Sequence, residues 1–326
     1  MLSARRRARA PWLDATAAAI ALALFTLRAG SSGQLTGQGL APFSRMIDGT
    51  AARPFVHRLL LPSLARGLHA LLPGPLRDAL PRATEVLALL LVLVCFLAFA
   101  FVLRRLLDAC YAAPAGVRRW APATALLALP ALFLPSSVQL YDPATLLLTA
   151  LGMLLILERR RPAYYAVFVL AGLNRETAIL LTGLFLLWEG RQLTPWRLAQ
   201  HALAQGMLWA GLQIAIRALH AGNPGHEAQL LFPHNLRLLI TPRAAIPFWG
   251  LLALSLALVV PGWKRAPRFL RLAALVMLIP VALGTLLTGL PTEMRDYLEA
   301  CPALFLIALP TVVAWLTRER MVARAV

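Results

Sequence analysis

The sequence has few charged residues, and very few of them are acidic. Only 14% of its 326 residues are charged, and its 14 Asp and Glu stand against 32 Arg and Lys. A soluble domain would carry about a quarter charged residues, so composition excludes an ordinary soluble protein. The sequence is 60% hydrophobic with a mean hydropathy of +0.70, and several apolar runs approach the roughly 20 residues that cross a bilayer. It predicts an all-α, multi-pass membrane protein that forms a single integral membrane domain over residues 1–326.

Several catalytic motifs are also missing from the sequence. There is no P-loop, GxGxxG, HExxH, GxSxG or CxxC, which argues against ATP-driven chemistry within the chain and against a bound cofactor. The three cysteines are scattered, and we expect them to be free. His220 and His226 are six residues apart in a Gly/Pro-containing loop. That spacing is weak evidence for metal, so a divalent metal is compatible with the sequence but not indicated by it.

The net charge of +18 does not indicate a nucleic-acid partner. The basic residues form short clusters between apolar runs, at 5–9, 104–105, 118–119, 159–161 and 264–271. Such clusters are typical of the cytoplasmic loops of membrane proteins. We therefore predict no nucleic-acid binding, and we interpret the basic N-terminus with the apolar run after it as an uncleaved first helix.

Eight apolar runs are long enough to be predicted as membrane spans. They cover residues 12–28, 84–103, 121–136, 141–157, 198–216, 246–261, 272–288 and 300–316. The stretch 163–188 is harder to interpret, because its two apolar arms have only eleven residues each and flank the charged tetrad at 174–177. At 1.5 Å per residue, one arm covers about half of a ~30 Å hydrocarbon core.

The distribution of basic residues favours a helical hairpin over 163–188. With the N-terminus inside, a hairpin leaves 20 of the 32 Arg and Lys on the cytoplasmic side, whereas a single span leaves 15 there. The hairpin predicts about ten membrane segments, with both termini cytoplasmic in a bacterial inner membrane. It also places a long loop, residues 29–83, on the periplasmic side.

Four polar clusters fall on the predicted outer face. Residues 53–73 form a predicted amphipathic interfacial helix, which is either a lipid anchor or a helix that presents His57 and Arg58 to an anionic head group. Asp142 precedes a proline, so it is either a helix N-cap or a carboxylate at a cavity mouth.

Arg175 and Glu176 lie at the predicted hairpin tip, where charges near hydrocarbon indicate function more than simple mutual neutralisation. Finally, Glu293, Arg295, Asp296 and Tyr297 precede the last helix, where such residues are also ordinary at an interface.

The order of these features resembles the GT-C type of bacterial integral membrane glycosyltransferases, chiefly their uncharacterised relatives. The matching stretches are "PFVHRLLLP" at 54–62, "YDPATLLL" opening a helix, "LNRETAILL" at the hairpin and "EMRDYLEACPAL" before the last helix. The resemblance implies transfer of a sugar from a polyprenyl-phosphate carrier to an envelope or lipid acceptor on the periplasmic face.

The resemblance also suggests roles for individual residues. Asp48 would be the base by its position in the first outer loop, although the surrounding sequence lacks the paired acidic residues expected there. Asp142 and Glu176 are the alternatives. Arginines hold the lipid phosphate in such enzymes, and the predicted substrate-binding set is His57, Arg58, Asn174, Arg175, Arg295 and Tyr297. The rival interpretations are a transporter or lipid flippase with Arg175 and Glu176 at a broken helix, and a non-catalytic membrane protein of envelope assembly. The sequence indicates no particular protein partner.

Overall fold

The computed structural model describes residues 10–38, 41–79, 82–133, 138–225, 230–317 and 321–324. It contains fourteen α-helices, and the only sheet in these ranges is a two-stranded pairing of β1 (Tyr111–Ala112) with β2 (Val322–Ala323). The all-α prediction is confirmed. Ser136, Ser137, His226 and the basic cluster 5–9 lie outside the described ranges.

Five helices are long and apolar enough to cross a membrane. They are α2 (Ala10–Ser31), α6 (Ala83–Cys110), α11 (Pro195–Leu219), α13 (Pro242–Trp263) and α14 (Arg268–Leu287). The apolar helices α8 (Asp142–Leu157) and α15 (Cys301–Leu316) are shorter, and α7 (Ala115–Phe133) carries two internal prolines. These helices support a membrane protein, while the number of ten crossings stays a prediction.

The predicted hairpin is formed by α9 (Arg161–Asn174) and α10 (Ile179–Glu189), joined by Arg175 and the 3₁₀ turn η2 (Glu176–Ala178). The two arms run antiparallel. Arg161 near the start of α9 pairs with Glu189 at the end of α10, and the rings of Tyr164 and Phe185 stack with centroids 5.2 Å apart. The tip of the hairpin therefore lies at the opposite end from Arg161.

Helix α11 packs along the hairpin through polar side chains spaced four residues apart. His201 contacts the Tyr165 hydroxyl, Gln205 accepts from Tyr164, Trp209 donates to the carbonyl of Glu176, and Gln213 donates to that of Gly172. Four-residue spacing places these groups on one helix face, while the opposite face is apolar and exposed. Helix α11 continues six residues past Gln213, so it ends about 9 Å beyond its contact with Gly172.

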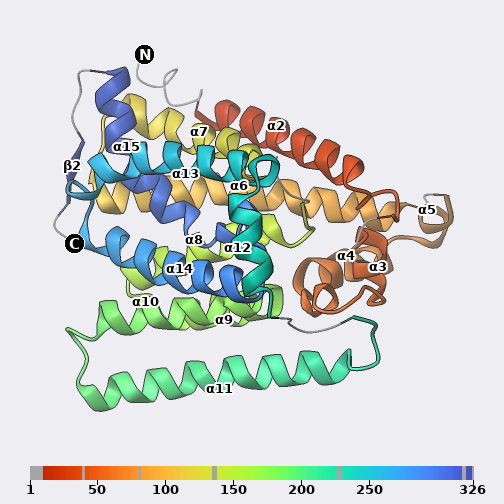
Figure 1. Ribbon diagram of the computed structural model, residues 1–326. Coiled ribbons are helices and arrows are strands. Elements are labelled where there is room, and N and C mark those ends of the chain that lie inside the picture. The colour runs from red at the N-terminus through yellow and green to blue at the C-terminus, as the bar shows by residue number, and fades with distance from the viewer. Residues whose placement is uncertain are drawn as a thin grey trace.

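The two ends of the bundle differ, as Figure 1 shows. The end that holds the start of α2 and strand β2 is fixed by the β1–β2 pairing and by an ion pair between Asp14 and Arg104. The other end carries α3 (Phe43–Asp48), the 3₁₀ turn η1 (Phe55–His57), α4 (Leu60–Ala70) and α5 (Gly74–Ala79). Helix α12 (Phe232–Ile240) and the 3₁₀ turn η3 (Met294–Tyr297) complete the described elements.

Helix α4 has two apolar faces. Leu61, Pro62 and Ala65 are buried in the protein, whereas Leu64 and Leu68 are 46% and 40% exposed and lie one helical turn apart. The predicted helix over 53–73 is shorter in the structure, because η1 and residues 58–59 precede α4, and its position at a membrane interface stays a prediction.

The backbones of α13 and α15 approach each other closely at Gly262 of α13. A Cβ atom there would lie 2.0 Å from the carbonyl oxygen of Ile307 in α15, whereas nothing lies within 4 Å of a Cβ on Gly250 in the same helix. Small residues allow this kind of close packing between membrane helices.

We therefore expect Gly262→Ala to lower the stability of the folded protein by about 1–3 kcal/mol, because α13 and α15 must separate. Gly250→Ala is the matched control and should leave stability unchanged or slightly raised, since alanine favours helix over glycine. Thermal unfolding in detergent measures both variants. Equal midpoints for the two would contradict this close α13–α15 contact.

Candidate functional site

Polar side chains from four distant segments meet where the short helices end. Arg58 follows η1, Asp142 begins α8, Arg175 and Glu176 form the hairpin tip, and Arg295 lies in η3. A backbone hydrogen bond from Leu59 to the carbonyl of Leu173 joins the outer segment to the hairpin (2.9 Å). We call this set, with its carboxylate partners Glu293, Asp296 and Glu299, the arginine–carboxylate cluster.

Arg58 and Glu176 form a two-pronged ion pair. One guanidinium nitrogen of Arg58 donates to Glu176 Oε1 at 2.7 Å and the other contacts Oε2. The Arg58 side chain is 8% exposed, but that of Glu176 is 35% exposed. Partial burial alone would raise the pKa of Glu176, but Arg58 and Arg175 outweigh it and hold that pKa below its ordinary value.

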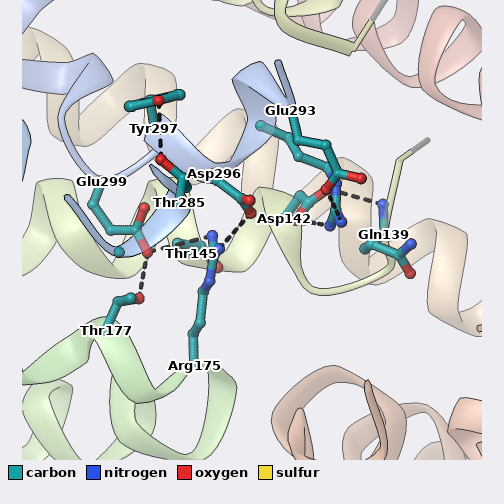
Figure 2. A network of polar contacts seen from close by, with 12 residues as sticks. Gln139, Asp142, Thr145, Arg175, Thr177, Thr285, Glu293, Asp296, Tyr297 and Glu299 are labelled. Carbon is teal, nitrogen blue, oxygen red and sulfur yellow. Dashed lines mark hydrogen bonds and ion pairs between the residues drawn. The ribbon is translucent and has the colours of Figure 1, made fainter. Parts of the chain in front are cut away.

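Arg175 is held by two carboxylates from the segment before α15. It donates to Asp296 Oδ1 at 2.7 Å and lies 3.4 Å from Glu299 Oε1, which also accepts from the Thr177 hydroxyl. Figure 2 shows Arg175 reaching from the hairpin to both carboxylates. The Glu299 side chain is 3% exposed, so its charge depends on this pairing.

Arg295 forms the third set of contacts in the arginine–carboxylate cluster. It donates to Glu293 at 2.6 Å and to the Tyr141 hydroxyl at 3.2 Å, and it lies 3.9 Å from Asp142. Tyr141 also faces Arg58, whose guanidinium carbon is 5.5 Å from the ring centroid. This buried tyrosine therefore contacts two of the three arginines, through its hydroxyl and through its ring.

The Asp142 side chain does not cap its helix. Its carboxylate accepts from the backbone N–H of Gln139 at 2.8 Å, three residues earlier, and no capping hydrogen bond into α8 is present. The carboxylate thus stabilises the turn before α8, and it is fully buried beside Arg295.

Two further sequence candidates differ in their position. Asn174 is 1% exposed and donates to the Tyr141 carbonyl and to the Thr145 hydroxyl, which ties the hairpin to α8. Tyr297 points away from the cluster, because its hydroxyl meets Thr285 at 3.1 Å, as Figure 2 also shows.

The remaining candidates lie in the outer segment. His57 is buried, with its ring 6.4 Å from that of His220. Asp48 is the last residue of α3 and is exposed, and no contact joins its carboxylate to the cluster in the described chain. The structure therefore brings together Arg58, Asn174, Arg175, Arg295, Asp142 and Glu176, but not Asp48 or Tyr297.

The sequence analysis named Asp296 in a polar cluster but gave no role to the carboxylates of Asp296 and Glu299 or to the ring of Tyr141, which the structure places against the arginines. Their sequence signal was present: Asp296 and Glu299 are three residues apart, just before an apolar helix. What the sequence does not give is which arginine each one faces.

No metal-binding group of three or more His, Cys, Asp or Glu is found in the described ranges. All three cysteines are free, as expected from their spacing. Comparisons with protein-family models, curated proteins and solved structures found no match, so they assign no family to the chain.

The balance of charges limits what the cluster can bind. Five carboxylates surround three guanidinium groups, and each arginine already has at least one carboxylate partner. An anionic ligand that takes over the paired N–H groups of an arginine must therefore replace a carboxylate. Glu176 is the most exposed of these partners, so the Arg58–Glu176 pair is the easiest to open.

We expect Arg175→Met to destabilise the protein by about 3–5 kcal/mol, because it leaves buried Glu299 and Asp296 without their cation. The matched control is Arg118→Met. Arg118 pairs with Asp108 but is 51% exposed, so its loss should cost about 0–1 kcal/mol.

Denaturant unfolding in detergent, followed by circular dichroism, compares these two variants with the wild type. Equal losses of stability would mean that the Arg175 contacts do not hold the cluster together.

Proposed function

We propose that this chain is a bacterial inner-membrane glycosyltransferase that takes a sugar from a polyprenyl-phosphate carrier. The transfer would occur at the non-cytoplasmic face, with both termini cytoplasmic. The observation that carries the proposal is the convergence of Arg58, Arg175 and Arg295 with several carboxylates at one end of an apolar helical bundle. Arginine binds phosphate through its planar fork of N–H donors.

The Arg58–Glu176 pair connects phosphate binding to base formation. A carrier phosphate that displaces Glu176 from Arg58 would leave this carboxylate without its closest cation. The pKa of Glu176 would then rise from its lowered value, which makes it a better proton acceptor. Donor binding would thus prepare the base.

The chemical step follows from these positions. The acceptor hydroxyl gives its proton to Glu176, and its oxygen forms a bond to the anomeric carbon of the sugar. The bond between that carbon and the carrier phosphate oxygen breaks, and the electron pair remains on the phosphate. The guanidinium groups stabilise the charge that develops there.

Access for a lipid carrier is compatible with the surrounding helices. The Glu176 side chain at the hairpin tip is 35% exposed, so a carrier phosphate can approach the cluster at this residue. The exposed leucines of α4 lie close by in sequence to Arg58, and they would contact the chain of the carrier.

The second candidate function is a transporter or lipid flippase. The charged tip of the α9–α10 hairpin favours it, because ionisable residues within membrane segments often line the pathways of transporters. Purified protein in liposomes would then move a labelled lipid phosphate across the bilayer without any change in its sugar.

For the transferase we expect Glu176→Gln to reduce turnover about 10²- to 10⁴-fold, because the amide cannot accept the proton. Turnover is measured with purified protein in nanodiscs and a panel of polyprenyl-phosphate sugars. Asp108→Asn, at the opposite end of the bundle beside Arg118, is the control and should keep full activity.

An Arg175→Ala/Glu176→Ala double variant should be inactive in the same assay. Wild-type turnover no different from that of this double variant, over the whole panel, would rule out the proposal.

A further inference from the structure

A small pocket lies at the hairpin tip, beside Arg175. It is lined by residues of α8, α9, the hairpin tip and the segment before α15, namely Thr145, Thr149, Ala171, Asn174, Arg175 and Glu299. The space has room for about one water molecule. The pocket is therefore too small for a sugar ring, but it fits a single hydroxyl group.

Two deeply buried side chains at this pocket have an oxygen without a hydrogen-bond partner in the described chain. Asn174 uses its NH₂ group on the Tyr141 carbonyl and the Thr145 hydroxyl, which leaves Oδ1 unpartnered. Glu299 uses Oε1 on Thr177, which leaves Oε2 unpartnered. These residues are 1% and 2% exposed, and a buried polar atom without a partner is costly.

Arg175 contributes the opposite kind of group. One of its terminal nitrogens is buried and makes no hydrogen bond, although it lies 3.4 Å from Glu299 Oε1. The pocket thus combines two acceptors that need a donor with a guanidinium N–H that needs an acceptor.

A water molecule has two O–H donors and two lone pairs, so it can donate to both oxygens and accept from the Arg175 N–H. A substrate hydroxyl has one O–H, so it can donate to only one of the two oxygens while it accepts from the same N–H. We propose that the pocket is a binding site for one hydroxyl group, which is either a water molecule or a hydroxyl of the sugar-bearing substrate. The substrate alternative rests on the proposed function, whereas the water alternative does not. The positive charge of Arg175 disfavours a metal cation at the same place, while the oxygen of a hydroxyl accepts from its N–H.

The direct test is an experimental structure of the wild-type protein in nanodiscs at a resolution that shows ordered waters. We expect a density peak within about 3.2 Å of both Asn174 Oδ1 and Glu299 Oε2. No peak there, or a protein group in contact with both oxygens, would overturn the proposal.

A pocket-filling substitution provides the matched comparison. Ala171→Val adds two methyl groups to a residue that lines the pocket, so the density peak should disappear. Ala166→Val makes the same change in the same helix at an exposed position and should keep the peak. A peak that persists in Ala171→Val would show that the hydroxyl lies elsewhere.

The source of the hydroxyl is decided with a bound, non-transferable polyprenyl-phosphate sugar analogue. If the sugar supplies the hydroxyl, the peak becomes continuous with the analogue, and Ala171→Val raises the KM for the donor about tenfold while Ala166→Val does not. If water supplies it, the peak stays separate and KM is unchanged. If the wild type transfers no sugar from any donor, the proposed function is refuted. The hydroxyl site is not refuted by that result, because it is tested by the density peak in the unliganded protein.

Discussion

The pairing of buried arginines with carboxylates is the interaction on which this end of the molecule depends. Arg58, Arg175 and Arg295 come from segments far apart in the sequence, and each lies against at least one carboxylate from another segment, namely Glu176, Asp296 and Asp142. A charge near hydrocarbon is tolerated only when it is paired. These pairs therefore fix the outer segment, the hairpin tip and η3 relative to one another.

The short helices α9 and α10 place the charged hairpin tip within the length of the bundle. The arms α9 and α10 have 14 and 11 residues, so both stop well short of the length of α11, which has 25. The polar stripe of α11 holds the hairpin at this depth, and Trp209 binds the carbonyl of Glu176 itself at 2.7 Å. The same contacts that stabilise the hairpin thus position the most exposed carboxylate of the cluster.

Much of this arrangement follows from the sequence, for physical reasons. Each eleven-residue arm of 163–188 is too short to span a bilayer. The distribution of basic residues in the loops therefore favoured a chain reversal at Arg175, and the antiparallel arms α9 and α10 agree with it. The composition likewise indicated membrane helices, five of which meet the length requirement. The distribution of Arg and Lys among the loops does not predict which side chains touch, however. The sequence therefore indicated three arginines on one face without indicating their carboxylate partners.

Asp48 shows where position in the sequence is a poor guide to position in space. It was selected because it precedes the interfacial helix, yet α3 ends there with the carboxylate exposed. Conversely, Glu299 lies in the stretch before the last helix, where acidic residues are ordinary, and the sequence predicted no role for it. Only the folded chain shows that it lies against Arg175 and Thr177.

The proposed replacement of Glu176 on Arg58 by a carrier phosphate is tested by equilibrium binding of polyprenyl phosphate to the protein in nanodiscs. Glu176→Gln should bind the lipid phosphate more tightly than the wild type, because the competing carboxylate is gone, and Arg58→Met should bind it more weakly. Weaker or unchanged binding in Glu176→Gln, with a folded protein, would contradict the account.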